Sequence, residues 1–164
     1  MDIVWQELTA GLGDAGQLIH VLVRLTAATL LGSMIGIQRE RAGKPAGLRT
    51  HILVTLGTAV FVLACAGVGM SSDGLSRVIQ GVVTGIGFIG AGSILKLNEQ
   101  RDVQGLTTAA GVWMTAAVGV AVGLGSLGVA LLSTIFTMFV LSFAKGFERR
   151  VDERRAADVE ARNN

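Results

Sequence analysis

The chain is dominated by long stretches that contain no acidic residue. None occurs between Glu40 and Asp73, between Asp73 and Glu99, or between Asp102 and Glu148. A soluble helical bundle would need polar stripes repeating every 3.6 residues within such stretches, and these are absent. Only 16% of the residues are charged, well below the roughly 25% of soluble domains. We therefore expect an all-α membrane protein.

Five apolar segments approach the roughly 20 residues that a helix needs to cross a bilayer core about 30 Å thick. They are Leu18–Ile37, His51–Gly69, Val78–Leu97, Gly105–Gly125 and Leu127–Ala144. The predicted organisation is an N-terminal segment (residues 1–17), a transmembrane domain of about five helices (18–144) and a short charged tail (145–164).

Lysine and arginine are distributed unequally between the two predicted sides. With five spans, twelve of the fourteen fall on one side: in the connection after the first segment, in the connection after the third, and in the tail. Only Arg77 falls on the other side, while Arg24 lies within the first segment. Because basic loops favour the cytoplasm, we expect the N-terminus outside and the C-terminus in the cytoplasm.

Several function classes are disfavoured by the residues present. Gly85 to Gly90 satisfies the pattern G-x-G-x-x-G, but it lies inside an apolar span, so dinucleotide binding is not expected. The basic clusters are short and form no continuous face for nucleic acid. Cys65 is mid-span while His20 and His51 lie at segment ends, so no nucleophilic triad can be assembled. The central spans contain no Asp or Glu, and we expect no enzyme, no metal site and no cofactor.

Glycine is frequent, at 23 residues, and recurs at small-xxx-small spacing. In lipid, such glycines let helix backbones approach closely, so they predict packing faces. The expected packing positions are Gly32, Gly36, Gly81, Gly85, Gly87, Gly90, Gly92, Gly119 and Gly123. The alternative is a local break in the third helix that binds an ion, as in transporters.

Arg24 is the one ionisable residue well inside a predicted span. It lies about seven residues, or roughly 10 Å, from Gln17 at the start of the segment. One interpretation is that its side chain snorkels to the outer headgroups. The other is a buried pair with Asp14, Asp73 or Asp102, or a site for an anionic ligand.

The connection after the first segment carries four basic residues, one glutamate and the only proline. It is interpreted either as a topological signal alone or as a binding or structural network in which Glu40 and Arg49 bridge two helix ends. We favour the network. Its candidate residues are Arg39, Glu40, Arg41, Lys44, Pro45, Arg49 and His51.

The fourth segment contributes three more candidates, Thr107, Thr108 and Trp113. Threonines inside a membrane bond to preceding carbonyls or to a neighbouring helix. The indole N–H of a central tryptophan needs a partner or water. Helix packing is favoured here over the alternative of a polar pocket near the cytoplasmic mouth.

Four strings of residues carry a family resemblance. They are Leu31-Gly-Ser-Met-Ile-Gly36-Ile-Gln-Arg39-Glu40, Lys44-Pro-Ala-Gly-Leu-Arg49-Thr-His51, Gly85-Ile-Gly-Phe-Ile-Gly-Ala-Gly92 and Gly105-Leu-Thr-Thr-Ala-Ala110. In this order and over about residues 24–125, the series resembles the MgtC/SapB family of bacterial inner-membrane proteins. One departure is Gln38, where members commonly carry glutamate. We expect a short, SapB-like member without the soluble C-terminal domain of the longer ones.

The resemblance implies a multi-pass protein of the bacterial inner membrane that serves adaptation to low magnesium and, in some members, survival inside phagocytes. It also implies action on other membrane machines, such as an ATP synthase or a transport ATPase. The leading hypothesis is therefore a non-enzymatic regulator that binds another membrane protein through its glycine-rich faces and basic inner loops.

Two alternatives stay open at this point. The first is a channel or transporter for magnesium or another small solute, formed by a homo-oligomer, with a site near Arg24 and the glycine-rich third helix. The second is a scaffold that retains anionic lipid at Arg39, Arg41 and Arg49. A homo-oligomer in the lipid bilayer, without nucleic acid, is the expected state.

Overall fold

The computed structural model describes residues 3–4, 14–97 and 102–143. Its long helices are α2 (Ala15–Arg41), α3 (Leu48–Gly67), α4 (Ser72–Gly92) and α5 (Leu106–Gly123). A shorter apolar helix, Leu127–Phe143, follows and is called the last helix below. The four labelled helices are long and apolar enough to cross a membrane. The expected all-α, multi-pass membrane protein is thereby confirmed.

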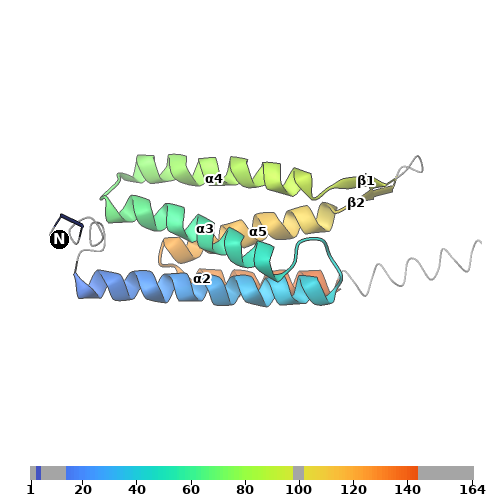
Figure 1. Ribbon diagram of the computed structural model, residues 1–164, viewed down its shortest axis with the longest axis horizontal. Coiled ribbons are helices and arrows are strands. Elements are labelled where there is room, and N and C mark those ends of the chain that lie inside the picture. Colours follow the sequence, from blue (N-terminus) through green and yellow to red (C-terminus); the bar gives the residue numbers. More distant parts are fainter. Residues whose placement is uncertain (1–2, 5–13, 98–101, 144–164) are drawn as a thin grey trace, which may run out of the picture.

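Successive helices run in opposite directions along one common axis (Figure 1). The connection 42–47 and residues 93–97 and 102–105 therefore lie at one end of the bundle, and the connections 68–71 and 124–126 lie at the other. The end that holds the connection 42–47 is called the basic end, because Arg39, Arg41, Lys44 and Arg49 lie there. The opposite end of the bundle is called the far end. This arrangement gathers the basic connections at one end, as five antiparallel segments require.

The helix starts follow from local capping. The Asp14 carboxylate accepts the backbone N–H of Gln17, 2.9 Å away, and so satisfies a free donor in the first turn of α2. Ser71 does the same for Gly74 at the start of α4, with a distance of 3.2 Å. These caps begin both helices several residues before the most apolar stretch.

At most of these ends the helices have other bounds than the predicted apolar segments. The first segment, expected over 18–37, extends over 15–41, and the second and fourth shift to 48–67 and 106–123. The third differs most, because α4 covers 72–92 instead of 78–97. Ser71 starts it early, and the chain leaves the helix at Ser93 to form strand β1 (Leu95–Leu97).

A short pair of antiparallel strands connects α4 to α5. The sequence did not predict these strands. Strand β1 pairs with β2 (Asp102–Gln104), with Leu95 opposite Gln104. Gly105 then turns the chain into α5 with a φ of 99°. A Cβ at this position would collide with the Ser93 carbonyl, so both the conformation and the space require glycine.

Small residues bring α3 into close contact with the helices on both of its sides. A Cβ at Gly36 of α2 would lie 2.7 Å from the Leu48 Cα, and one at Gly119 of α5 would lie 2.5 Å from the Thr55 carbonyl oxygen. Such close approach maximises dispersion contacts where lipid removes the hydrophobic drive. The main buried apolar cluster is shared by α2, α3, α5 and the last helix, so these four form the centre of the bundle.

Helix α4 lies outside this centre, at the edge opposite α2 (Figure 1). Only Ile86 and Gly90 of α4 are buried. In its most apolar 18 residues 11% are buried, against 50% in α5. Most of the surface of α4 is thus free to contact lipid or another protein.

Candidate functional site at the basic end

A buried arginine joins two helices at the basic end. Arg39, in the last turn of α2, is only 3% exposed, and its Nη2 donates to Thr108 Oγ1 at 2.9 Å. Thr108 lies in the first turn of α5 and is also buried. A buried cation is stable only when its donors are paired, so this contact connects α2 to α5.

A fully buried histidine lies next to this pair. His51 Nδ1 is 2.6 Å from Thr115 Oγ1, and that hydroxyl donates its proton to the Gly111 carbonyl at 2.8 Å. Because a threonine has one hydroxyl proton, the contact with Nδ1 needs the ring proton on Nδ1 while Thr115 donates to Gly111. The backbone of Ala46 also interacts with the ring. A Cβ at Gly111 would lie 4.0 Å from His51 Cε1, which is ordinary van der Waals contact, so the ring packs against this turn of α5.

Glu40 caps α3 from the neighbouring helix. The cap position of α3 is Gly47, which has no side chain to offer, and Glu40 Oε2 accepts the Leu48 N–H at 2.9 Å instead. The expected bridge from Glu40 to Arg49 is not formed in the part of the chain that the structure describes. The carboxylate is used by a backbone donor of the first turn, and Arg49 lines a groove between α3 and α4.

The connection after α2 presents positive charge outward. Arg41, Lys44 and Pro45 are exposed, while Ala46 is buried. The turn is closed by a hydrogen bond from Lys44 N to Arg39 O at 3.1 Å, and Gly43 adopts a φ of 66° there. Within one cluster, therefore, Arg39 serves the fold and the other basic side chains face the surroundings.

Gln38 was not among the expected site residues, yet it attaches the last helix to α2. Its Nε2 donates to the Met138 carbonyl at 2.9 Å and to Ser142 Oγ. Since a carbonyl only accepts, the amide nitrogen must face Met138. In the sequence, position 38 stands out only as a glutamine where family members commonly carry glutamate. The difference matters here, because a glutamate could not donate to that carbonyl.

Arg24 lies at the far end and not in the candidate site. Its Nη1 donates to the Gly123 carbonyl at 2.9 Å, next to Gly125, where a Cβ would come within 2.6 Å of Arg24 Nη2. Both glycines lie where α5 ends, so the guanidinium caps the negative end of that helix. No carboxylate pairs with Arg24 among the described residues, so neither Asp14 nor Asp73 is its partner.

The two remaining acidic candidates lie apart from each other. Asp73 is exposed in the first turn of α4, where a negative charge suits the helix dipole. Asp102 is the first residue of β2, near the basic end. Across residues 14–97 and 102–143, no three His, Cys, Asp or Glu side chains converge on a site for a metal ion.

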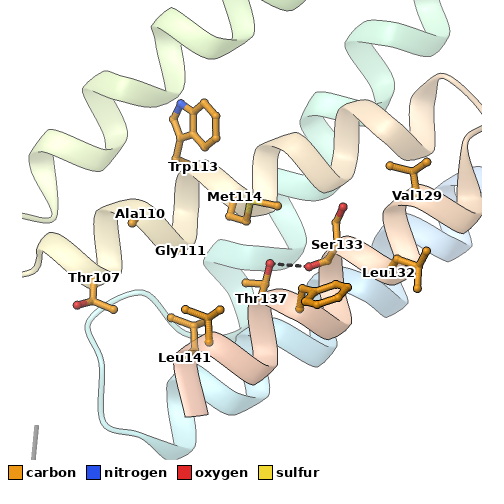
Figure 2. Close-up of a pocket in the computed structure, with 12 residues that line it drawn as sticks. Thr107, Ala110, Gly111, Trp113, Met114, Val129, Leu132, Ser133, Thr137 and Leu141 are labelled. Carbon is orange, nitrogen blue, oxygen red and sulfur yellow. Dashed lines mark hydrogen bonds between the residues drawn. The ribbon is translucent and has the colours of Figure 1, made fainter. Parts of the chain in front are cut away.

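Thr107 and Trp113 line an apolar groove between α5 and the last helix, with a volume of about 830 Å³. Figure 2 shows Ser133 and Thr137 on its wall, joined by a hydrogen bond, and the Trp113 ring directed toward α4. Trp113 is 45% exposed. The groove is bordered mainly by aliphatic and aromatic side chains, so the polar pocket considered for this segment is not found here.

The glycine positions fall into two groups. Gly32, Gly36, Gly119 and Gly123 lie against α3, where an added Cβ would collide with its atoms. Around Gly81, Gly85, Gly87 and Gly92 a Cβ would meet nothing within 4 Å, and at Gly90 it would make ordinary contact with Ala109. Apart from Gly90, these glycines of α4 therefore have no helix contact within the described chain.

Comparison with known sequences decides the family. Residues 25–150 match the profile of the MgtC family. The chain belongs to the MgtC family. The match starts just after Arg24 and includes the whole cluster of Arg39, His51 and Thr108. No solved structure matches the chain.

Three relatives of this MgtC-family chain illustrate the range. Protein SrpB of Synechococcus elongatus is 43% identical over 145 residues, covering 82% of this chain and 80% of SrpB. "Putative magnesium transporter YhiD" of Escherichia coli K12 is 41% identical over 130 residues, covering 73% of this chain and 58% of YhiD. Protein MgtC of Salmonella typhimurium is 39% identical over 132 residues, covering 80% of this chain and 55% of MgtC. The chain thus spans just over half the length of YhiD and MgtC.

Proposed function

We propose that this MgtC-family chain serves magnesium homeostasis at the bacterial inner membrane as a non-enzymatic regulator that contacts another membrane protein. The proposal rests on family membership, on the magnesium role named for the relative YhiD, and on one feature of the fold, the outer face of α4. This face is defined by the exposed residues Gln80, Thr84, Gly87, Phe88 and Ala91.

The outer face of α4 is the observation that carries the proposal. Phe88 is 84% exposed beside Gly87, where a Cβ would meet nothing within 4 Å. A large ring next to a bare backbone position forms a ridge and a notch, which suits docking against a second helix. In α2 and α5, by contrast, Gly32, Gly36, Gly119 and Gly123 are packed against α3.

The interior of the bundle supports a regulator more than a conduit. Its buried threonines at positions 55, 58, 115, 134 and 137 donate to carbonyls of their own helices. No described carboxylate is buried in a span. A hydrated ion path would need polar groups that are free to coordinate the ion.

Transport is the second candidate, and the name of YhiD is the observation in its favour. In that version a homo-oligomer of this chain would carry magnesium along a pathway shared between copies. Magnesium uptake into dye-loaded proteoliposomes separates the two functions. The regulator proposal expects no uptake above that of empty liposomes.

The regulator proposal is tested by crosslinking in the native membrane together with growth. A photo-reactive residue at Phe88 is expected to give a reproducible adduct with another membrane protein in magnesium-poor medium. The same residue at Phe139, which is 64% exposed on the last helix, is the matched control and is expected to give none. Phe88→Ala should also lose the ability to restore growth of a deletion strain in that medium. Adducts at both positions, or normal growth with Phe88→Ala, would contradict the proposal.

A further inference from the structure

A groove of about 760 Å³ runs between α3 and α4, on a different side of α4 from its outer face. It is called the α3/α4 groove below. Its walls are apolar side chains of both helices. They include Leu53, Val54 and Phe61 of α3 and Val78, Val82 and Ile89 of α4.

Glycines keep this groove open. Gly57 of α3 and both Gly81 and Gly85 of α4 line it, and an added Cβ at any of the three would meet nothing within 4 Å. The absence of side chains at these positions leaves space that no other part of the described chain fills. In a bilayer such a space is occupied by acyl chains.

The basic end of the groove carries a cation. Arg49 and Thr50 line it in the first turn of α3, and Arg49 is exposed, with no carboxylate partner among the residues that the structure describes. From position 39 to position 49 the chain has four basic residues and one acidic one, and that glutamate caps Leu48. The groove is thus apolar along its length and positively charged at one end.

We propose that the α3/α4 groove holds one anionic phospholipid, with an acyl chain between the helices and the headgroup phosphate on Arg49. The arrangement matches the two parts of such a lipid in order and in charge. Basic pockets between transmembrane helices on the cytoplasmic side are a recurrent site for anionic headgroups. An arginine is suited to this role because its planar guanidinium donates two parallel hydrogen bonds to a phosphate.

The size of the groove favours a lipid chain over a protein helix. A transmembrane helix is rigid and roughly 10 Å wide, so it suits the opening of a groove between two adjacent helices better than its glycine-lined floor. A flexible acyl chain can follow that floor down to Gly81.

Native mass spectrometry of the delipidated full chain provides the test, with phosphatidylglycerol and phosphatidylcholine of identical acyl chains as the two probes. Wild type is expected to bind one phosphatidylglycerol more tightly than phosphatidylcholine. Arg49→Gln should weaken phosphatidylglycerol binding about fivefold, the effect of one basic residue near an anionic lipid, and leave phosphatidylcholine binding unchanged. Arg41→Gln is the matched control, because Arg41 is exposed at the same end but does not line the groove.

A second pair of variants tests the acyl-chain half of the site. Gly81→Leu fills the groove and should weaken binding of both lipids, while Gly87→Leu, on the outer face of α4, should change neither. Equal losses of phosphatidylglycerol binding in Arg49→Gln and Arg41→Gln would overturn the proposal, because they would show that the lipid responds to the general surface charge and not to a site at Arg49. Unchanged binding with a folded Gly81→Leu would overturn it as well. None of these outcomes depends on the partner protein proposed above.

Discussion

The contact between α3 and α5 at Gly119 gives the sharpest test of the packing described here. A Cβ at this position would collide with the Thr58 hydroxyl and would lie 2.5 Å from the Thr55 carbonyl oxygen and 3.0 Å from its Cα. Two of these atoms belong to the backbone of α3, so a rotamer change cannot relieve the contact. Gly119→Ala must therefore move α5 away from α3.

The size of the effect follows from two opposing terms. Overpacking a tight core costs about 1–3 kcal/mol, and contact with backbone atoms places this case near about 3 kcal/mol. Replacing a helical glycine by alanine returns about 0.5–1 kcal/mol. The net loss is about 2 kcal/mol, a change of roughly 30-fold in the ratio of folded to unfolded protein.

Gly87→Ala is the matched control for this substitution. It makes the same chemical change in a helix, but the added methyl group meets nothing within 4 Å. The control is expected to be neutral or slightly stabilising. Unfolding in mixed micelles with increasing SDS, followed by the helical circular dichroism signal, measures both variants. Equal midpoints for the two variants would show that α3 and α5 do not pack as described.

Three further predictions concern individual polar contacts. Thr108→Val removes one acceptor of the Arg39 side chain and is expected to cost about 1–3 kcal/mol in the same unfolding assay, whereas Thr108→Ser should cost less than half of that. Arg24→Ala should lower the free energy of unfolding by about 1 kcal/mol, because the end of α5 loses its cap. Magnesium uptake into proteoliposomes should stay at the level of empty liposomes for both wild type and variant. Uptake that wild type supports and Arg24→Ala abolishes would refute the capping role as the main role of Arg24. Glu40→Ala should cost about 0.5–1 kcal/mol and Glu40→Gln less, since an amide oxygen still accepts the Leu48 N–H, so an equal loss for both would exclude a capping role.

The candidate site was predictable in its location and less so in the roles of its members. Arg39, Glu40 and Arg49 were expected to act as one charged network, yet each has a separate function. Arg39 is buried on Thr108, Glu40 caps α3, and Arg49 lines the α3/α4 groove. Residues only ten positions apart face different helices, and the direction of each depends on where α3 and α5 lie.

The same limit applies to the glycines. Gly32, Gly81 and Gly119 each begin a small-xxx-small pattern, so sequence spacing treats them alike. In the structure Gly32 and Gly119 lie against α3, and Gly81 faces open space. Spacing along a helix shows that a face is smooth, but a contact also needs a neighbouring helix at that face.

The sequence by itself determined that the chain is a helical membrane protein and that its basic connections lie at one end. Both follow from composition and order along the chain, because acid-free apolar tracts can satisfy their backbone groups in lipid only as helices. Tertiary structure alone decided that α3 is the central helix and that α4 stays at the edge. It also decided that Arg24 caps α5. These features depend on contacts between residues far apart in the chain, such as the 99 positions from Arg24 to Gly123, which local patterns do not encode.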